Sequence, residues 1–166
     1  PVFEIPSGNT QQIALKCNRG EVPTGWGLAR RTPGNALTIA SVMPSRRGWL
    51  FTVANPGPIG AAGTVYGRCL QRKQRAASGQ RHIFSTRVAS FSQNIDGGGT
   101  TSRSCRKREL SVATGVLLPA GNGIQLTATG VFGSRGGEWS FLQPFGAAEI
   151  TTSLICLARG TGFHRR

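Results

Sequence analysis

Short apolar stretches alternate with polar residues along almost the whole chain. Val, Ile, Thr and Phe recur at every second position, and Gly, Pro and Asn bound the stretches. Apolar residues at every second position place one face of a strand in a core and the other in solvent. We found no stretch with the three-to-four-residue apolar spacing of a helix that is free of Gly and Pro. The pattern therefore predicts strands and turns, and no helices.

We expect six strands in each part of the chain. In the first part they fall near Val2–Ile5, Gln12–Cys17, Gly25–Ala29, Ala36–Met43, Trp49–Ala54 and Gly63–Leu70. In the second part they fall near Thr86–Gln93, Thr101–Cys105, Ser111–Leu118, Gly123–Gly130, Glu138–Gln143 and Glu149–Ala158. Short strands separated by regular turns are typical of antiparallel sandwiches and small barrels.

The same pattern occurs twice. Cys17 to Cys69 spans almost the same length as Cys105 to Cys156, and residues within and beside these spans correspond: Glu21 with Glu109, Trp49–Phe51 with Trp139–Phe141, Asn55 with Gln143, and Arg72 with Arg159. We therefore predict an all-β chain of two tandem antiparallel β-sandwich or small-barrel units related by internal duplication. Residues 1–72 form the first unit, 73–83 a basic linker, and 84–166 the second unit with a basic tail.

Four cysteines allow three pairings, and the repeat favours Cys17 with Cys69 and Cys105 with Cys156. Units of about 80 residues are marginally stable without such a crosslink. Each bridge would contribute roughly 4 kcal/mol through loop closure. The alternative is four buried free thiols in a reducing compartment. Disulfides indicate a secreted or cell-surface location, with a virion surface as the alternative. Because the chain opens on Pro1, we expect either a cleaved leader or a trimmed Met.

The paired aromatic residues are expected in the core. Trp49 and Phe51 lie two apart on a strand, so both rings point to one face, and Trp139 and Phe141 repeat this arrangement. Leu37, Ile39 and Val53 are also expected to be buried. An exposed platform on which a sugar or base stacks is the alternative for the tryptophans.

Charge is strongly unbalanced, with 20 Lys and Arg against six Asp and Glu, a formal net charge of +14. Most of the cations are arginines, whose planar guanidinium suits phosphate, sulfate and carboxylate groups. Such a charge attracts polyanions. The candidate polyanion-binding residues lie around the linker and the second cysteine pair: Arg68, Arg72, Lys73, Arg75, Arg81, Arg87, Arg103, Arg106, Lys107 and Arg108. The alternative for each is a solvated surface that maintains solubility.

The sequence contains no recognisable catalytic motif. It lacks paired carboxylates, a Gly-x-Ser-x-Gly turn and a phosphate-binding Gly-rich loop, and its cysteines and histidines are too widely spaced for a zinc site. We therefore predict no catalytic residues, no metal site and no cofactor. The apolar runs are also too short to span a membrane.

Two segments of the first unit resemble a repeat found in secreted bacterial proteins. They are Gly-Trp-Leu-Phe-Thr-Val-Ala-Asn-Pro at 48–56 and Thr-Val-Tyr-Gly-Arg-Cys at 64–69. The second unit departs from the pattern, with Gln143 in place of Asn and Ser-Leu-Ile before the last cysteine. The resemblance covers most of both repeats. It implies tandem extracytoplasmic, disulfide-linked β-domains of uncharacterised function.

These observations favour a non-enzymatic extracytoplasmic structural or adhesion protein. Its basic surface would contact an acidic polymer, such as polysaccharide, lipopolysaccharide or nucleic acid, or copies would assemble into an oligomer, filament, sheath or coat. One alternative is a nucleic-acid-binding or virion structural protein. A second is a carbohydrate-binding module that uses Trp49 or Trp139.

Overall fold

The computed structural model describes residues 1–31, 37–45, 47–75, 79, 81–119, 124–143 and 146–162, with the backbone alone for 81 and 159–162. This part of the chain contains strands and no helix. The strands are β1 (Val2–Ile5), β2 (Thr10–Lys16), β3 (Glu21–Arg30), β4 (Thr38–Ser45), β5 (Gly48–Ala54), β6 (Ala61–Gln71), β7 (Lys73–Arg75), β8 (Arg81–Asp96), β9 (Gly99–Ser104), β10 (Glu109–Leu117), β11 (Gln125–Phe132), β12 (Gly136–Leu142) and β13 (Ala147–Gly162).

The strands form three open antiparallel sheets. One has the order β1-β6-β3, another β11-β12-β9, and the largest runs β2-β5-β4-β10-β13-β8-β7. All of the pairings between neighbouring strands are antiparallel. The all-β prediction is therefore confirmed, and open sheets are adopted in place of a small barrel.

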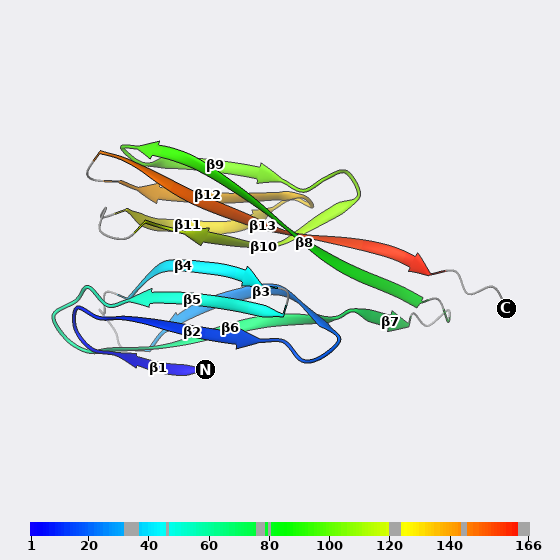
Figure 1. Cartoon of the computed structure of the whole chain (residues 1–166), viewed down its shortest axis with the longest axis horizontal. Coiled ribbons are helices and arrows are strands. Elements are labelled where there is room, and N and C mark those ends of the chain that lie inside the picture. The colour runs from blue at the N-terminus through cyan, green and yellow to red at the C-terminus, as the bar shows by residue number, and fades with distance from the viewer. Residues whose placement is uncertain are drawn as a thin grey trace.

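Each half of the chain places one sheet against another. In the N-terminal half (β1–β6), Trp26 of β3 packs edge-on against Phe51 of β5, with ring centroids 5.8 Å apart. In the C-terminal half (β8–β13), a Cβ added to Gly137 of β12 would meet the side chain of Leu154 of β13. β1-β6-β3 thus faces β2-β5-β4, and β8-β13-β10 faces β9-β12-β11 (Figure 1). Each half has a sandwich-like core.

The two halves are joined edge to edge through β4 and β10. Val42 lies opposite Val116, and both are fully buried. Beyond this pair, the Leu118 N–H donates to the Ala40 carbonyl at 3.0 Å. This junction makes the largest sheet continuous across the molecule, and Figure 1 shows one half stacked above the other.

The paired aromatic residues lie in the core, as predicted. Trp49 is 2% exposed and Trp139 0%, and Phe51 and Phe141 are also buried. The Trp139 indole N–H donates to the Gly115 carbonyl at 3.0 Å. These two tryptophans are therefore not available as a stacking platform. Leu37 and Val53 are buried and Ile39 is partly buried.

Each of the twelve expected strands overlaps an observed one, although Ala36 and Gly123 lie outside the described residues. The main differences are in length and in β7. β8 and β13 pair continuously from Asp96–Ala147 to Arg81–Gly162, well beyond the expected ends. β7 lies within the segment predicted as a linker and pairs with the start of β8. Its side chains are polar and exposed, so the sequence carries no apolar pattern that predicts this strand. Backbone hydrogen bonds form the pairing.

The described part of the chain contains no helix of the length and apolarity needed to cross a bilayer.

Candidate polyanion-binding surface

Both predicted disulfides are present. Cys17 bonds to Cys69 and Cys105 bonds to Cys156, with Cα atoms 5.8 Å and 5.6 Å apart. The chain has no free cysteine. Two intact bridges indicate an oxidising environment, because thiol reductants keep cytosolic cysteines reduced.

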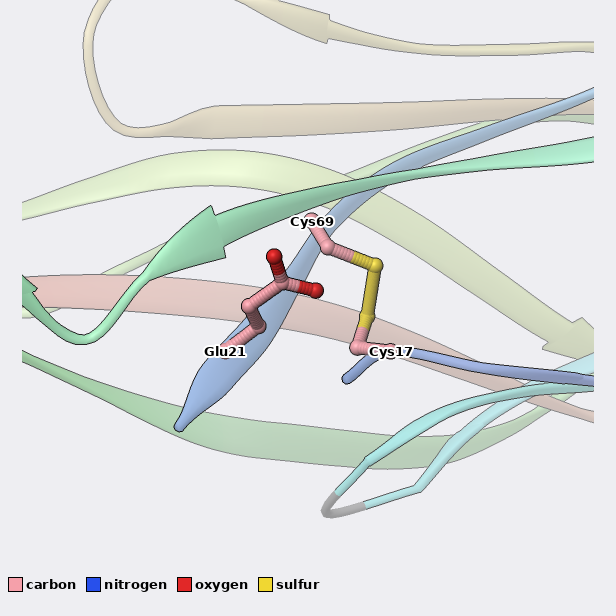
Figure 2. Close-up of side chains that lie close together, drawn as sticks. All are labelled: Cys17, Glu21 and Cys69. Carbon is pink, nitrogen blue, oxygen red and sulfur yellow. A yellow bond between two sulfur atoms is a disulfide. The ribbon is translucent and has the colours of Figure 1, made fainter. Parts of the chain in front are cut away.

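A glutamate fixes the turn that follows the first cysteine of each half. In the first half, the Glu21 carboxylate accepts the Asn18 N–H at 2.9 Å and the Gln71 side-chain amide at 3.0 Å. Figure 2 shows this carboxylate beside the Cys17–Cys69 bridge. The glutamate therefore links the turn to the end of β6, beside the bridge.

Glu109 repeats this arrangement in the second half and adds an ion pair. It accepts the Arg106 N–H at 3.0 Å and the Arg87 guanidinium at 2.6 Å. The hydrogen bond with Arg87 lowers the pKa of the Glu109 carboxyl below its ordinary value, against the opposing effect of partial burial. The same bond raises the pKa of Arg87. Both groups are therefore held in their charged forms.

Each bridge and its glutamate bring potential metal-ligand atoms within 4.8 Å of one another. The sulfur atoms are bonded to each other, however, and metal binding by cysteine requires a free thiolate. One carboxylate beside a disulfide is not a metal site, so we assign these clusters to the structure of the turns.

Basic segments from several elements meet at the end of the molecule that carries the bridges. The Cys17 N–H donates to the Arg47 carbonyl at 2.6 Å, and the Cys105 N–H donates to the Arg135 carbonyl at 2.8 Å. Arg72 lies against the first turn through a 2.8 Å bond to the Gly20 carbonyl. The chain reversals that approach each bridge therefore bring their cations together.

We call this region the basic end. Its exposed cations come from both halves and from the segment between them: Lys16, Arg19, Arg47, Arg68, Arg72, Lys73, Arg75, Arg106, Lys107, Arg108 and Arg135. Three carboxylates lie near these cations: Glu21 and Glu109 are occupied by the contacts described above, and Glu138 of β12 is exposed. The basic end therefore carries a large excess of positive charge.

Three other acidic residues lie at the opposite ends of the strands. Asp96 is the last residue of β8, Glu149 lies near the start of β13, and Glu4 is in β1. Glu149 is seven residues from Cys156, or roughly 23 Å along an extended strand. Arg30 and Arg31 lie at this end too and largely cancel these three charges, so the excess positive charge is concentrated at the basic end.

Most of the predicted binding residues lie in the basic end. Two others, Arg87 and Arg103, are engaged in contacts within the protein. Arg87 forms the ion pair with Glu109. Arg103 donates to the Gln93 amide oxygen at 2.8 Å, and its guanidinium lies 5.2 Å from the centroid of Phe91. These intramolecular contacts leave both guanidiniums less available to a ligand. The side chain of Arg81 and the tail from 163 onward lie outside the described residues.

Four members of the basic end are absent from the predicted binding residues: Lys16, Arg19, Arg47 and Arg135. Lys16 and Arg19 flank Cys17, and their closeness to this cysteine in the sequence could have identified them. Arg47 and Arg135 are far from any cysteine in sequence, and only the backbone bonds to Cys17 and Cys105 bring them close.

Comparison of the sequence with known protein families and with curated proteins finds no match in either.

Proposed function

We propose that this chain is a non-enzymatic, extracytoplasmic binding protein that attaches to an acidic polysaccharide through its basic end. The observation that carries the proposal is the gathering of exposed cations from both halves around the two disulfide turns. Six acidic residues in the chain cannot neutralise 20 basic ones, and two of the six are engaged in the turns. A dense positive surface of this kind attracts a flexible polyanion.

The two halves are, in this proposal, duplicated units. Support comes from the sheet orders: β1-β6-β3 corresponds to β8-β13-β10, and β2-β5-β4 corresponds to β9-β12-β11 when strands are matched in chain order. The disulfides and the capping glutamates correspond as well. Duplication of a unit whose cysteine turns are basic doubles the charge at one end of the molecule.

The disulfides favour polysaccharide over nucleic acid as the partner. Intact bridges fit secretion or display at a surface, where carboxylated and sulfated polysaccharides are the common polyanions. Recognition of single-stranded nucleic acid usually adds exposed aromatic rings that stack on bases. The side chains of Trp49 and Trp139 are buried, so neither offers such a ring, whereas Tyr66 and Phe132 are about half exposed. The preference for polysaccharide therefore rests on the disulfides.

Binding of fluorescent heparin oligosaccharide, measured by anisotropy, tests this proposal. Arg72→Ser with Arg75→Ser removes two cations from the basic end. The control, Arg30→Ser with Arg31→Ser, removes the same charge from the other end of the N-terminal half. We expect the first pair to weaken binding about tenfold and the control to change it less than about twofold. Equal effects would show that net charge alone attracts the probe, and tighter binding of single-stranded DNA would favour a nucleic-acid partner.

A further inference from the structure

Two strand edges that face each other across the junction of the halves have no strand partner. Within the described residues, β3 pairs only with β6, and β11 pairs only with β12. On the other side of the molecule the corresponding edges, β4 and β10, do pair. The junction is thus closed along one sheet and open along the other.

A groove of about 390 Å³ occupies the open side. Its walls are Gly25–Leu28 of β3, with the ring of Tyr66 against Gly27, and Thr129–Val131 of β11, and its floor is Val112–Thr114 of β10. Trp26 and Leu28 also line a second hollow that continues toward Arg30 and Gln125–Thr127. The open edges therefore run along a continuous depression for about six residues, or roughly 20 Å of extended chain.

The groove presents hydrogen-bonding backbone groups on both walls. In an antiparallel pair, every second residue directs its N–H and C=O away from the partner. These groups of β3 and β11 point into the space between the strands. A polypeptide in extended conformation is the ligand that satisfies such a row on each side, as in strand addition to a sheet edge. Sugars and nucleotides do not carry N–H and C=O groups at the spacing of a strand.

The side chains beside the groove indicate which positions of a bound strand would be apolar. Leu28 lies opposite Val65, which is 1% exposed, so Leu28 points toward the interior of the sandwich. Thr129 lies opposite the buried Trp139 and points inward too. An occupying strand would therefore carry apolar residues at alternate, inward positions.

Charge at the two ends of the β3 wall favours acidic residues in the occupant. Among the described lining residues of both hollows, Arg30 is the only charged one. At the other end, the Arg68 side chain packs beside Gly25. Gly25 and Arg30 are five residues apart, about 17 Å, and this odd spacing puts the two guanidiniums on opposite faces of the sheet.

We propose that the β3–β11 groove binds an extended, acidic segment of a partner protein, which pairs with both open edges and bridges the two three-stranded sheets. Acidic side chains five positions apart in the segment face Arg30 and Arg68. A second copy of this chain is disfavoured because each copy carries a formal net charge of +14.

The probe is a fluorescein-labelled peptide with the core Asp-Thr-Val-Thr-Val-Asp, added to the full chain. Its two comparison peptides replace both Asp by Lys, or methylate the backbone nitrogens of alternate core residues. Backbone methylation removes donors and keeps the side chains, so it tests pairing directly. Hydrogen exchange of the protein amides locates the bound peptide.

We expect saturable binding of the acidic peptide, binding about tenfold weaker for the Lys peptide, and no saturation with the methylated peptide. Exchange should slow in β3 and β11, and the outer edges β1 and β9 should stay unchanged. Arg30→Ala should weaken binding severalfold, and Arg31→Ala, its neighbour outside the lining, should not. Equal binding of the methylated peptide, protection outside the groove, or slow exchange of β3 and β11 through self-association without peptide would each overturn the proposal.

Discussion

The indole N–H of Trp26 in β3 donates a hydrogen bond to the carbonyl of Thr114 in β10, and so links the two halves of the chain. Each of these residues lies five positions after the glutamate of its half, Glu21 or Glu109. Residues at the same distance from the two glutamates therefore meet at the junction. The ring of Trp26 also packs against Phe51, so this side chain belongs to the core of one half and the junction with the other.

Trp26→Phe should loosen the junction. Phenylalanine keeps an aromatic ring against Phe51 but removes the donor, and the Thr114 carbonyl loses its indole partner. We expect a loss of roughly 1–2 kcal/mol in the free energy of unfolding, with separate unfolding of the two halves in denaturant. We expect the circular dichroism and fluorescence transitions to coincide in the wild type and to separate in this variant.

Trp139→Phe is the control for Trp26→Phe, because it removes a similar indole bond within one half, to Gly115. This variant should be destabilised while its transitions still coincide. Coincident transitions in Trp26→Phe as well would show that the Trp26 bond does not couple the halves.

Arg108→Gly should stabilise the protein. Arg108 has a φ of 78°, in the left-handed region that L-residues with side chains adopt at a cost. Gly20, at the same distance after Cys17 as Arg108 is after Cys105, has a φ of 87°. We expect a gain of about 0.5–1 kcal/mol in thermal or chemical unfolding. The reverse change, Gly20→Arg, should lower stability, and a gain from that change would contradict the account of the turn.

The Arg87–Glu109 pair should make stability depend on pH in the acidic range. Because Arg87 lowers the pKa of Glu109 in the folded protein, the pair stabilises the fold above the ordinary pKa of 4.5. The contribution is lost as pH falls from that value through the lower pKa of the folded state. Glu109→Gln should lower stability at neutral pH and flatten its decline below about pH 4.5. An unchanged acid dependence would show that the pair contributes nothing to it.

The local pattern was sufficient to predict every strand except β7 and the burial of the core aromatics, and the repeat was sufficient to predict the bridges. Trp49 and Trp139 each lie in an alternating strand, and the matched cysteine spans favour one pairing over the others. Alternation of apolar and polar residues specifies which face of a strand is buried, so the burial of these tryptophans can be predicted from their own strands.

The junction and the groove were not predictable from the sequence. Pairing of Val42 with Val116 and the absence of a partner for β3 depend on how two sandwich edges meet. Periodicity carries no information about which edges join. Likewise, the exposed Arg72 and the ion-paired Arg87 look alike in a basic stretch, and only the fold brings Glu109 to one of them.

The salt dependence of heparin binding tests the central proposal most directly. Each cation that contacts the polymer releases counterions, so the logarithm of affinity should fall linearly with the logarithm of salt concentration. We expect a steep slope for the wild type, a shallower one for Arg72→Ser with Arg75→Ser, and the wild-type slope for Arg30→Ser with Arg31→Ser. Binding that is absent, or a slope unchanged by loss of Arg72 and Arg75, would contradict attachment through the basic end.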